Sequence, residues 1–308
     1  MKRFDIAALG EGMVEFNQTR PGEPQYLQGF GGDTSNAAIA AARAGARTAY
    51  LSRIGDDVFG RDLLALWNAE GVDVSGVETD AQAPTGLYFV NHGPAGHEFT
   101  YRRAGSAAAR MSARWLRNGA AGQLVRDARI LHVSGISLAI SREAREAVFA
   151  AMAIARENGT LISFDANLRL KLWTLEEARP AMEQAIAMAD IFLPSLDEIA
   201  VLTGLQDPQA VIAWGHARGA RTIVLKLGER GSIVSDGARM QALAPLQVEA
   251  VDATGAGDCF AGNFLARLAA GDSVFDAARY ANAAAALAVQ GWGAVAPLPR
   301  PEQVRAVL

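Results

Sequence analysis

The sequence has little sulfur chemistry, because its 308 residues include one cysteine, Cys259. One cysteine cannot form an internal disulfide, so a disulfide-stapled secreted scaffold is excluded and a reducing, cytoplasmic environment is expected. Asp258 precedes it, and a neighbouring carboxylate raises the pKa of a thiol, which favours a small buried residue over a reactive nucleophile. The four histidines are scattered without metal-ligand spacing, so a zinc site is not expected.

Long apolar runs and an excess of positive charge are also missing. No run of 18 or more apolar residues occurs, and Met1-Lys2-Arg3 leads straight into a β-like segment, so we expect neither a membrane span nor a secretory signal. The net charge of −4 gives no basic footprint for nucleic acid. The apolar content of 50% and charged content of 20% are those of an ordinary soluble enzyme with a large core.

Short β-branched or aromatic runs alternate with Ala-rich amphipathic stretches along most of the chain. Predicted strands span 4–9, 47–54, 130–134, 161–165, 191–194, 222–227, 232–235 and a β-like run at 246–251. Predicted helices span 35–44, 61–70, 141–157, 175–187, 196–203, 208–218, 259–270 and 274–289. This alternation favours an α/β sandwich with a mainly parallel sheet, whose ligands bind at the carboxyl ends of the strands. Asp165, Pro194, Gly228 and the Gly255 loop fall at such ends.

Two segments, 15–30 and 85–101, break the alternation because they lack helical spacing and are rich in aromatic residues. We predict antiparallel strands that project from the main sheet and form a lid that excludes water from a pocket. A surface hairpin without a role is the alternative. Internal repeats and low-complexity linkers are missing from the sequence. We therefore expect one domain, 1–308, with lid strands from about 12–30 and 84–104.

The stretch from Val251 to Asp258 reads Val-Asp-Ala-Thr-Gly-Ala-Gly-Asp and opens a long apolar helix. Small residues at a helix start (Gly255, Ala256 and Gly257) leave backbone N–H groups free, and these groups attract an anion such as a phosphate. A carboxylate at the same place would be unfavourable for phosphate binding alone, but Asp258 is suited to take a proton from a hydroxyl that attacks the phosphate. The pattern therefore predicts phosphoryl transfer.

A second polar cluster, residues 29–36, precedes the first long helix. Gly31 and Gly32 permit a close backbone approach, while Asp33 and Asn36 offer polar atoms that could hold sugar hydroxyls. Capping this helix would need only Thr34 or Ser35, although a turn with a cap remains the alternative.

These two clusters resemble, in order and separation, the two signatures of the ribokinase-like (PfkB) carbohydrate kinases, and the resemblance covers nearly the whole chain. It implies a three-layer α/β/α sandwich with a mostly parallel central sheet and a small β lid. It also implies ATP and Mg²⁺ as cofactors, with a monovalent cation left open. By resemblance Asp258 is the general base, and Gly255, Ala256 and Gly257 hold the transferred phosphoryl group. The signature's usual threonine is replaced by Ala253.

The resemblance also suggests a nucleotide site. Lys226, Gly228 and Gly231 resemble the family's ATP-contacting loop, although a plain hairpin turn explains the glycines equally well. Further nucleotide contacts are implied for Asn167, Ser195, Gly255, Gly257 and Asn282. The family's Asn-x-x-Glu motif appears here as Ser195 to Glu198, with Ser in place of Asn. Glu198 would act on Mg²⁺ through water, the alternative being a helix N-terminal charge favoured by the helix dipole.

Within this family the strings 31–34, 86–88, 99–103, 134–140 and 164–173 are most similar to 2-keto-3-deoxygluconate kinases. The implied substrate contacts are Gly32, Asp33, Asn36, Tyr88, Tyr101, Arg102, Arg103 and Arg169. A keto acid carries a carboxylate that neutral sugars lack, and arginine pairs with carboxylates in bidentate fashion. The expected reaction is ATP-dependent phosphorylation of 2-dehydro-3-deoxy-D-gluconate at its C6 hydroxyl. Trp292 lies where some of these kinases have an acidic residue.

Other functions remain open. The chain could be a fructokinase-like enzyme, a kinase for a different keto-deoxy acid, or a non-catalytic sugar-acid sensor. A dinucleotide oxidoreductase is disfavoured, because Gly10-Glu11-Gly12 lacks a third glycine and no helix follows. The expected partner is a small-molecule sugar acid, and no nucleic-acid or membrane partner is expected. An exposed apolar face of the lid would favour a homo-oligomer, a dimer or larger.

Overall fold

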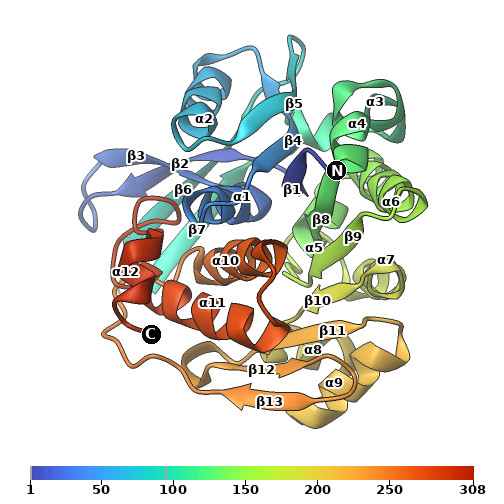
Figure 1. Ribbon diagram of the computed structural model, residues 1–308. Helices are drawn as coiled ribbons and strands as arrows, with labels where there is room; N and C mark the ends of the chain where they lie inside the picture. The colour runs from blue at the N-terminus through green and yellow to red at the C-terminus, as the bar shows by residue number, and fades with distance from the viewer. Residues whose placement is uncertain (1, 94–95) are drawn as a thin grey trace.

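A computed structural model describes residues 2–93 and 96–308. Met1 and residues 94–95, which fall within the predicted lid segment 84–104, lie outside the described residues. Within the described ranges the strands form two sheets (Figure 1). The large sheet has nine strands in the order β13-β12-β11-β10-β9-β8-β1-β4-β5, and the small sheet has four in the order β3-β2-β6-β7.

The large sheet is mainly parallel, as predicted. Its strands are β1 (Phe4–Leu9), β4 (Thr48–Gly55), β5 (Asp73–Asp80), β8 (Ala128–Ser134), β9 (Leu161–Asp165), β10 (Ile191–Leu193), β11 (Thr222–Lys226), β12 (Ser232–Ser235) and β13 (Met240–Leu243). The pairs from β5 across to β11 are parallel, whereas β11–β12 and β12–β13 are antiparallel. The carboxyl ends of β1, β8, β9, β10 and β11 therefore meet at one edge, where ligands bind in such sheets.

Helices cover both faces of the large sheet, which confirms the predicted three-layer sandwich. One face packs on α3 (Ala113–Asn118), α4 (Ala120–Asp127), α5 (Gly135–Ala139), α6 (Arg142–Glu157), α7 (Leu175–Met188), α8 (Leu196–Thr203) and α9 (Pro208–Ala217). The other carries α1 (Asp33–Arg43), α2 (Val58–Ala69), α10 (Ala256–Ala270), α11 (Val274–Ala288) and α12 (Pro301–Arg305). Two short 3₁₀ turns, η1 (Ala108–Arg110) and η2 (Gly228–Arg230), complete the elements. Among the described residues, we find no helix with the length and apolar content that a membrane span needs.

The small sheet contains β2 (Met13–Gln18), β3 (Tyr26–Gly31), β6 (Gly86–Gly93) and β7 (Gly96–Arg102). The pairs β2–β3 and β6–β7 are antiparallel, as predicted, but β2–β6 is parallel. The physical reason is that β2 continues from β1 and β6 from β5, and both of these parent strands leave the same edge of the large sheet in the same direction. The prediction of a wholly antiparallel lid is therefore wrong.

One further strand prediction is wrong, and two strands were missed. Residues 246–251, predicted as β-like, form no strand, and the backbone N–H of Val251 donates instead to Val289 in the segment after α11. The edge strands β5 and β13 were not predicted. β5 carries charged residues at both ends and β13 is only four residues long, so neither shows the apolar run of a buried strand.

Candidate active site

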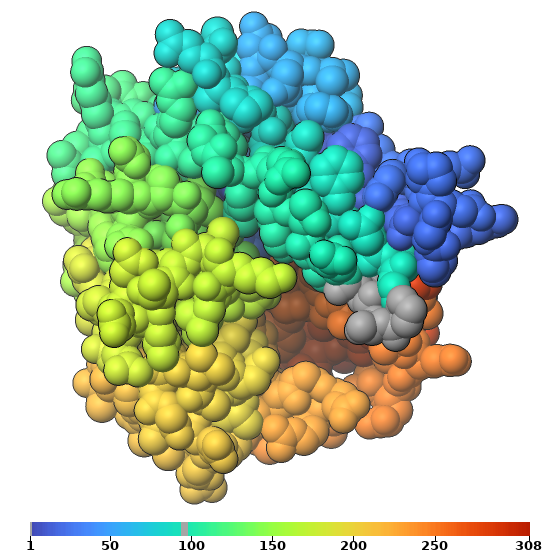
Figure 2. Space-filling model, turned by 180° about the vertical axis from the view of Figure 1, so that it is seen from behind, coloured from blue at the N-terminus to red at the C-terminus, as the bar shows by residue number. Residues whose placement is uncertain are grey.

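A cavity of about 570 Å³ opens where the carboxyl ends of the parallel strands face the small sheet. Figure 2 shows the hollow between the teal residues of the small sheet and the yellow and orange residues of the large-sheet body, with orange-red C-terminal residues behind it. Thirteen of the predicted site residues line the cavity: Gly32, Asp33, Asn36, Tyr88, Tyr101, Arg103, Asn167, Arg169, Glu198, Lys226, Gly255, Gly257 and Asp258.

The start of α10 forms the floor of this cavity. Gly255 precedes the helix with φ 75°, in the left-handed region that glycine tolerates. Because glycine has no side chain, no side-chain hydrogen bond caps the start of the helix. Asp252 shapes the loop before it: one carboxylate oxygen accepts from the N–H and hydroxyl of Thr254 at 2.9 and 2.6 Å, and the other accepts from Gly293 N–H at 2.9 Å. The Ala256 N–H, the first of the 15-residue helix, donates to the Ala253 carbonyl oxygen at 3.2 Å. The next two N–H groups, of Gly257 and Asp258, have no acceptor among the described residues and stay available for an anion.

Asp258 lies in the first turn of α10 and accepts a hydrogen bond from the Asn36 side-chain amide at 2.8 Å. Burial raises the pKa of Asp258 well above its usual range, and the nearby Asp33 carboxylate raises it further. The Asn36 hydrogen bond and the Lys226 ammonium oppose this rise. A buried carboxylate with a raised pKa is a stronger base than an exposed one, which suits it to accept a hydroxyl proton.

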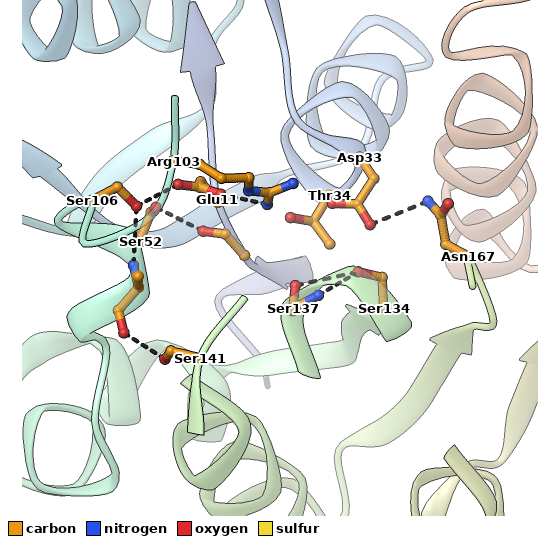
Figure 3. A network of polar contacts seen from close by, with 12 residues as sticks. Glu11, Asp33, Thr34, Ser52, Arg103, Ser106, Ser134, Ser137, Ser141 and Asn167 are labelled. Carbon is orange, nitrogen blue, oxygen red and sulfur yellow. Dashed lines mark hydrogen bonds and ion pairs between the residues drawn. The ribbon is translucent and has the colours of Figure 1, made fainter. Parts of the chain in front are cut away.

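Asp33 and Asn167 bring two strand ends together across the cavity. The Asn167 amide donates to the Asp33 carboxylate at 3.2 Å, from the segment after β9 to the first turn of α1 (Figure 3). Asn167 has φ 30°, a left-handed conformation that is uncommon outside glycine. Burial also raises the pKa of Asp33, and a hydrogen bond from the Ser134 side chain partly offsets this rise. The pair therefore places polar atoms at the centre of the cavity wall.

Two ion pairs line the side of the cavity nearest β10 and β11. Lys226 Nζ lies 2.7 Å from an Asp165 carboxylate oxygen, and Arg169 Nη1 lies 3.1 Å from Glu198 Oε1. Burial raises the pKa of Glu198, and the positive charges of Lys226 and Arg169 oppose this rise. The other carboxylate oxygen of Glu198, Oε2, is buried without a hydrogen-bond partner among the described residues. Across residues 2–93 and 96–308, no group of three or more His, Cys, Asp or Glu side chains is placed to hold a metal ion.

The small sheet contributes aromatic rings to the cavity, and the residue that follows β7 contributes an arginine. The rings of Tyr88 and Tyr101 stack with centroids 5.7 Å apart, and the Tyr88 hydroxyl donates to the buried Glu15 at 2.5 Å. Side chains alternate between the two faces of a strand, so Tyr101 and Arg103 line the cavity while the exposed Arg102 does not.

Five other predicted residues also lie outside the lining: Ser195, Gly228, Gly231, Ala256 and Asn282. Gly231, at φ 85°, is required by the turn itself, because a Cβ there would lie 2.2 Å from the Leu243 carbonyl oxygen. Ser195 precedes α8 and forms an isolated bridge with Lys226, which does line the cavity. The Asn282 amide nitrogen on α11 is buried without a hydrogen-bond partner among the described residues.

Two charged lining residues were not predicted. Glu11 was considered only as part of a dinucleotide-like Gly-x-Gly string, and Lys171 lies within the predicted string 164–173 but received no role. Of the arginines and lysines that line the cavity, Lys171 alone makes no hydrogen bond or ion pair within the described part of the chain. Its signal in the sequence was its place two residues after Arg169, in the segment that follows β9.

Comparison with known proteins gives a consistent result. The sequence pattern of the pfkB family carbohydrate kinases matches residues 3–301. A 2-dehydro-3-deoxygluconokinase of Thermoproteus tenax is 35% identical over 99% of this chain and 94% of its own length. A probable fructokinase-4 of Arabidopsis thaliana is 32% identical over 98% of this chain and 96% of its own. The crystal structure of a putative ribokinase II from E. coli in complex with ATP and Mg²⁺ has a TM-score of 0.90 at 28% identity, covering 99% of this chain and 98% of its own.

Proposed function

Because the chain belongs to the pfkB family of carbohydrate kinases, we propose that it is an ATP-dependent kinase of a sugar acid, 2-dehydro-3-deoxy-D-gluconate. The observation that carries the proposal is the placement of Asp258 and the N–H groups of Gly257 and Asp258 in one cavity with three cationic side chains, Arg103, Arg169 and Lys171. Phosphorylation of a neutral sugar needs only the base and the N–H groups, whereas a substrate with a carboxylate also needs cationic side chains to bind it.

In the proposed reaction the acid end of the substrate lies against the cationic side chains, and its C6 hydroxyl lies against Asp258. Asp258 accepts the hydroxyl proton while the oxygen attacks the γ-phosphorus of ATP; the new O–P bond forms and the bond to the ADP oxygen breaks. The N–H groups at the start of α10 stabilise the charge on the phosphoryl oxygens. The small sheet acts as a lid that excludes water.

The residues present fit a magnesium ion held through water. The unpartnered Glu198 Oε2 is a carboxylate oxygen, the type of ligand that Mg²⁺ prefers, and Mg²⁺ commonly binds one or two carboxylates together with substrate phosphates and waters. When bound, Mg²⁺ neutralises phosphate charge. For the nucleotide we propose Lys226, Asn167 and the turn at 228–231, with Ser195 and Asn282 as outer contacts. The relative with 28% identity that was solved with ATP and Mg²⁺ supports this part of the proposal.

A second candidate is a kinase of a neutral sugar, which the fructokinase relative at 32% identity favours. The deciding experiment measures ATP consumption with Mg²⁺ on 2-dehydro-3-deoxygluconate, fructose, ribose and gluconate. We expect saturable turnover on the keto acid. Turnover on fructose alone would reject the sugar-acid assignment and keep the phosphoryl-transfer site, whereas binding of the keto acid without turnover would indicate a sensor. Replacing K⁺ with tetramethylammonium in the same assay tests the monovalent cation.

We further propose that the chain forms a homo-oligomer through the outer face of the small sheet, where Leu27 is 69% exposed. Sedimentation of the purified protein tests this expectation.

A further inference from the structure

Glu11 lies at the point where the chain crosses between the two sheets. The chain makes four such crossings, at residues 10–12, at 32, at 81–85 and at 103–107. Glu11 belongs to the first crossing and contacts the second and fourth, together with the first residue of β6. A Cβ on Gly32 would lie 2.2 Å from the Glu11 carbonyl oxygen, and one on Gly86 would lie 2.6 Å from Glu11 Oε1, so both positions are glycine where Glu11 needs space.

The fourth crossing gives Glu11 its two polar partners. Arg103 forms an ion pair with Glu11 Oε2, and the Ser106 hydroxyl donates to Glu11 Oε1 at 2.6 Å. Figure 3 shows Glu11 between these two side chains, with the separate Asp33–Asn167 hydrogen bond to their right. The carboxylate thus holds the segment that follows β7 against the segment that follows β1.

The Glu11 side chain is 1% exposed and that of Arg103 9% exposed. Removing one member of a buried ion pair leaves the charge of the other uncompensated, which is strongly destabilising. The two side chains are therefore held in contact. Nη2 of Arg103 makes the contact with Glu11 Oε2, Nε is buried without a hydrogen-bond partner among the described residues, and Glu11 is the one ion-pair partner of Arg103 there. The guanidinium is therefore oriented chiefly by the charge of Glu11 rather than by several hydrogen bonds.

We propose that Glu11 is a positioning residue that acts through Arg103. By holding the guanidinium at the cavity wall, Glu11 fixes the group that receives the carboxylate of the substrate. The contact forms only when the segment after β7 lies against the segment after β1. The assignment of the acceptor as a sugar acid rests on the function proposed above, but the coupling between Glu11 and Arg103 does not.

The first test is Glu11→Gln, a neutral residue of the same shape whose amide oxygen still accepts from Ser106. We expect KM for the sugar acid to rise about tenfold or more, the usual size of a lost charged hydrogen bond, with kcat and KM for ATP changed less than about threefold. The matched control is Glu70→Gln. Glu70 forms a buried ion pair with Arg43 at 2.7 Å, with side chains 13% and 11% exposed, outside the cavity. Glu70→Gln should lower Tm and leave KM for the sugar acid and KM for ATP unchanged.

A double-mutant cycle with Arg103→Met separates positioning from general stability. If Glu11 acts through Arg103, adding Glu11→Gln to Arg103→Met changes the affinity for the acceptor less than about twofold. Multiplicative effects of the two substitutions would overturn the proposal. Should Glu11→Gln fail to fold, Ser106→Ala replaces it in the cycle with the same two outcomes.

Acceptor affinity is measured by calorimetry without ATP as well as by KM, on the panel compound that wild type binds most tightly. If that compound is a neutral sugar, the proposed function fails while the cycle still reports whether Glu11 and Arg103 are coupled.

Discussion

Asp258 is the residue on which the proposed chemistry depends. Its carboxylate is partly buried beside the free N–H groups of Gly257 and Asp258, and the Asn36 amide orients it by a hydrogen bond of 2.8 Å. We expect Asp258→Asn to lower kcat by about 10²–10⁴, the usual contribution of a general base, because the amide has the same shape but cannot accept the proton. ATP affinity, measured by calorimetry, should change less than about threefold. Loss of ATP binding in parallel with activity would contradict the assigned role.

The pH profile gives this prediction a second readout. Only the ionised carboxylate accepts a proton, so wild-type kcat should fall as pH drops through the raised pKa of Asp258. The residual activity of Asp258→Asn should lack this acid limb.

At the residue scale, the place of Asp258 in the cavity could be predicted because its signal is local: a glycine-alanine run, a carboxylate and an apolar helix within twenty positions. Glu11 could not, since its partner Ser106 is 95 positions away and the sequence between them gives no sign of the crossing. Lys171 is intermediate, being close to a predicted residue in sequence, but only the fold shows that it lines the cavity without a partner.

At the scale of elements, the pleat of β7 separates two adjacent arginines that the sequence could not distinguish. Arg103 lines the cavity and Arg102 is exposed on the other face. We therefore predict that Arg103→Ala raises KM for the acceptor at least tenfold, whereas Arg102→Ala changes it less than twofold, measured by steady-state kinetics. Arg102→Ala serves as the matched control, because both variants lose the same side chain from neighbouring positions. Equal effects would mean that the register of β7 differs in solution.

Helices and strands were predicted correctly where their burial produces a clear pattern of apolar residues in the sequence. The central strands β1, β8, β9 and β11 are apolar runs, and α6 and α10 are long amphipathic or apolar stretches. Edge strands carry weaker signals, which is why β5 was missed. Residues 246–251 were wrongly assigned because they begin with the apolar–polar alternation of a strand but pair with no strand among the described residues. The parallel pairing of β2 with β6 depends on where their parent strands leave the large sheet, which no local pattern contains.

At the scale of the whole molecule, the catalytic geometry depends on how closely two helices approach. Asn36 on α1 and Asp258 on α10 meet at the cavity, and farther along the same helices Gly262 packs against α1. A Cβ on Gly262 would lie 2.2 Å from the Ala37 carbonyl oxygen and 2.8 Å from Ala40 Cβ. The glycine therefore sets the spacing between the sugar-side helix and the phosphate-side helix, although it touches neither proposed ligand.

We predict that Gly262→Ala destabilises the fold by about 1–3 kcal/mol, as overpacking does, even though alanine normally favours a helix over glycine. It should also lower kcat about tenfold or more, because pushing α1 from α10 displaces Asn36 from Asp258. The control is Gly215→Ala on α9, where a Cβ would lie 2.6 Å from Ile223 Cδ1, outside the cavity. Thermal unfolding should show both variants destabilised, and kinetics at a temperature where both stay folded should show a loss of kcat for Gly262→Ala alone. A fully active but destabilised Gly262→Ala would mean that the site tolerates helix displacement, and that the Asn36–Asp258 contact does not limit the rate.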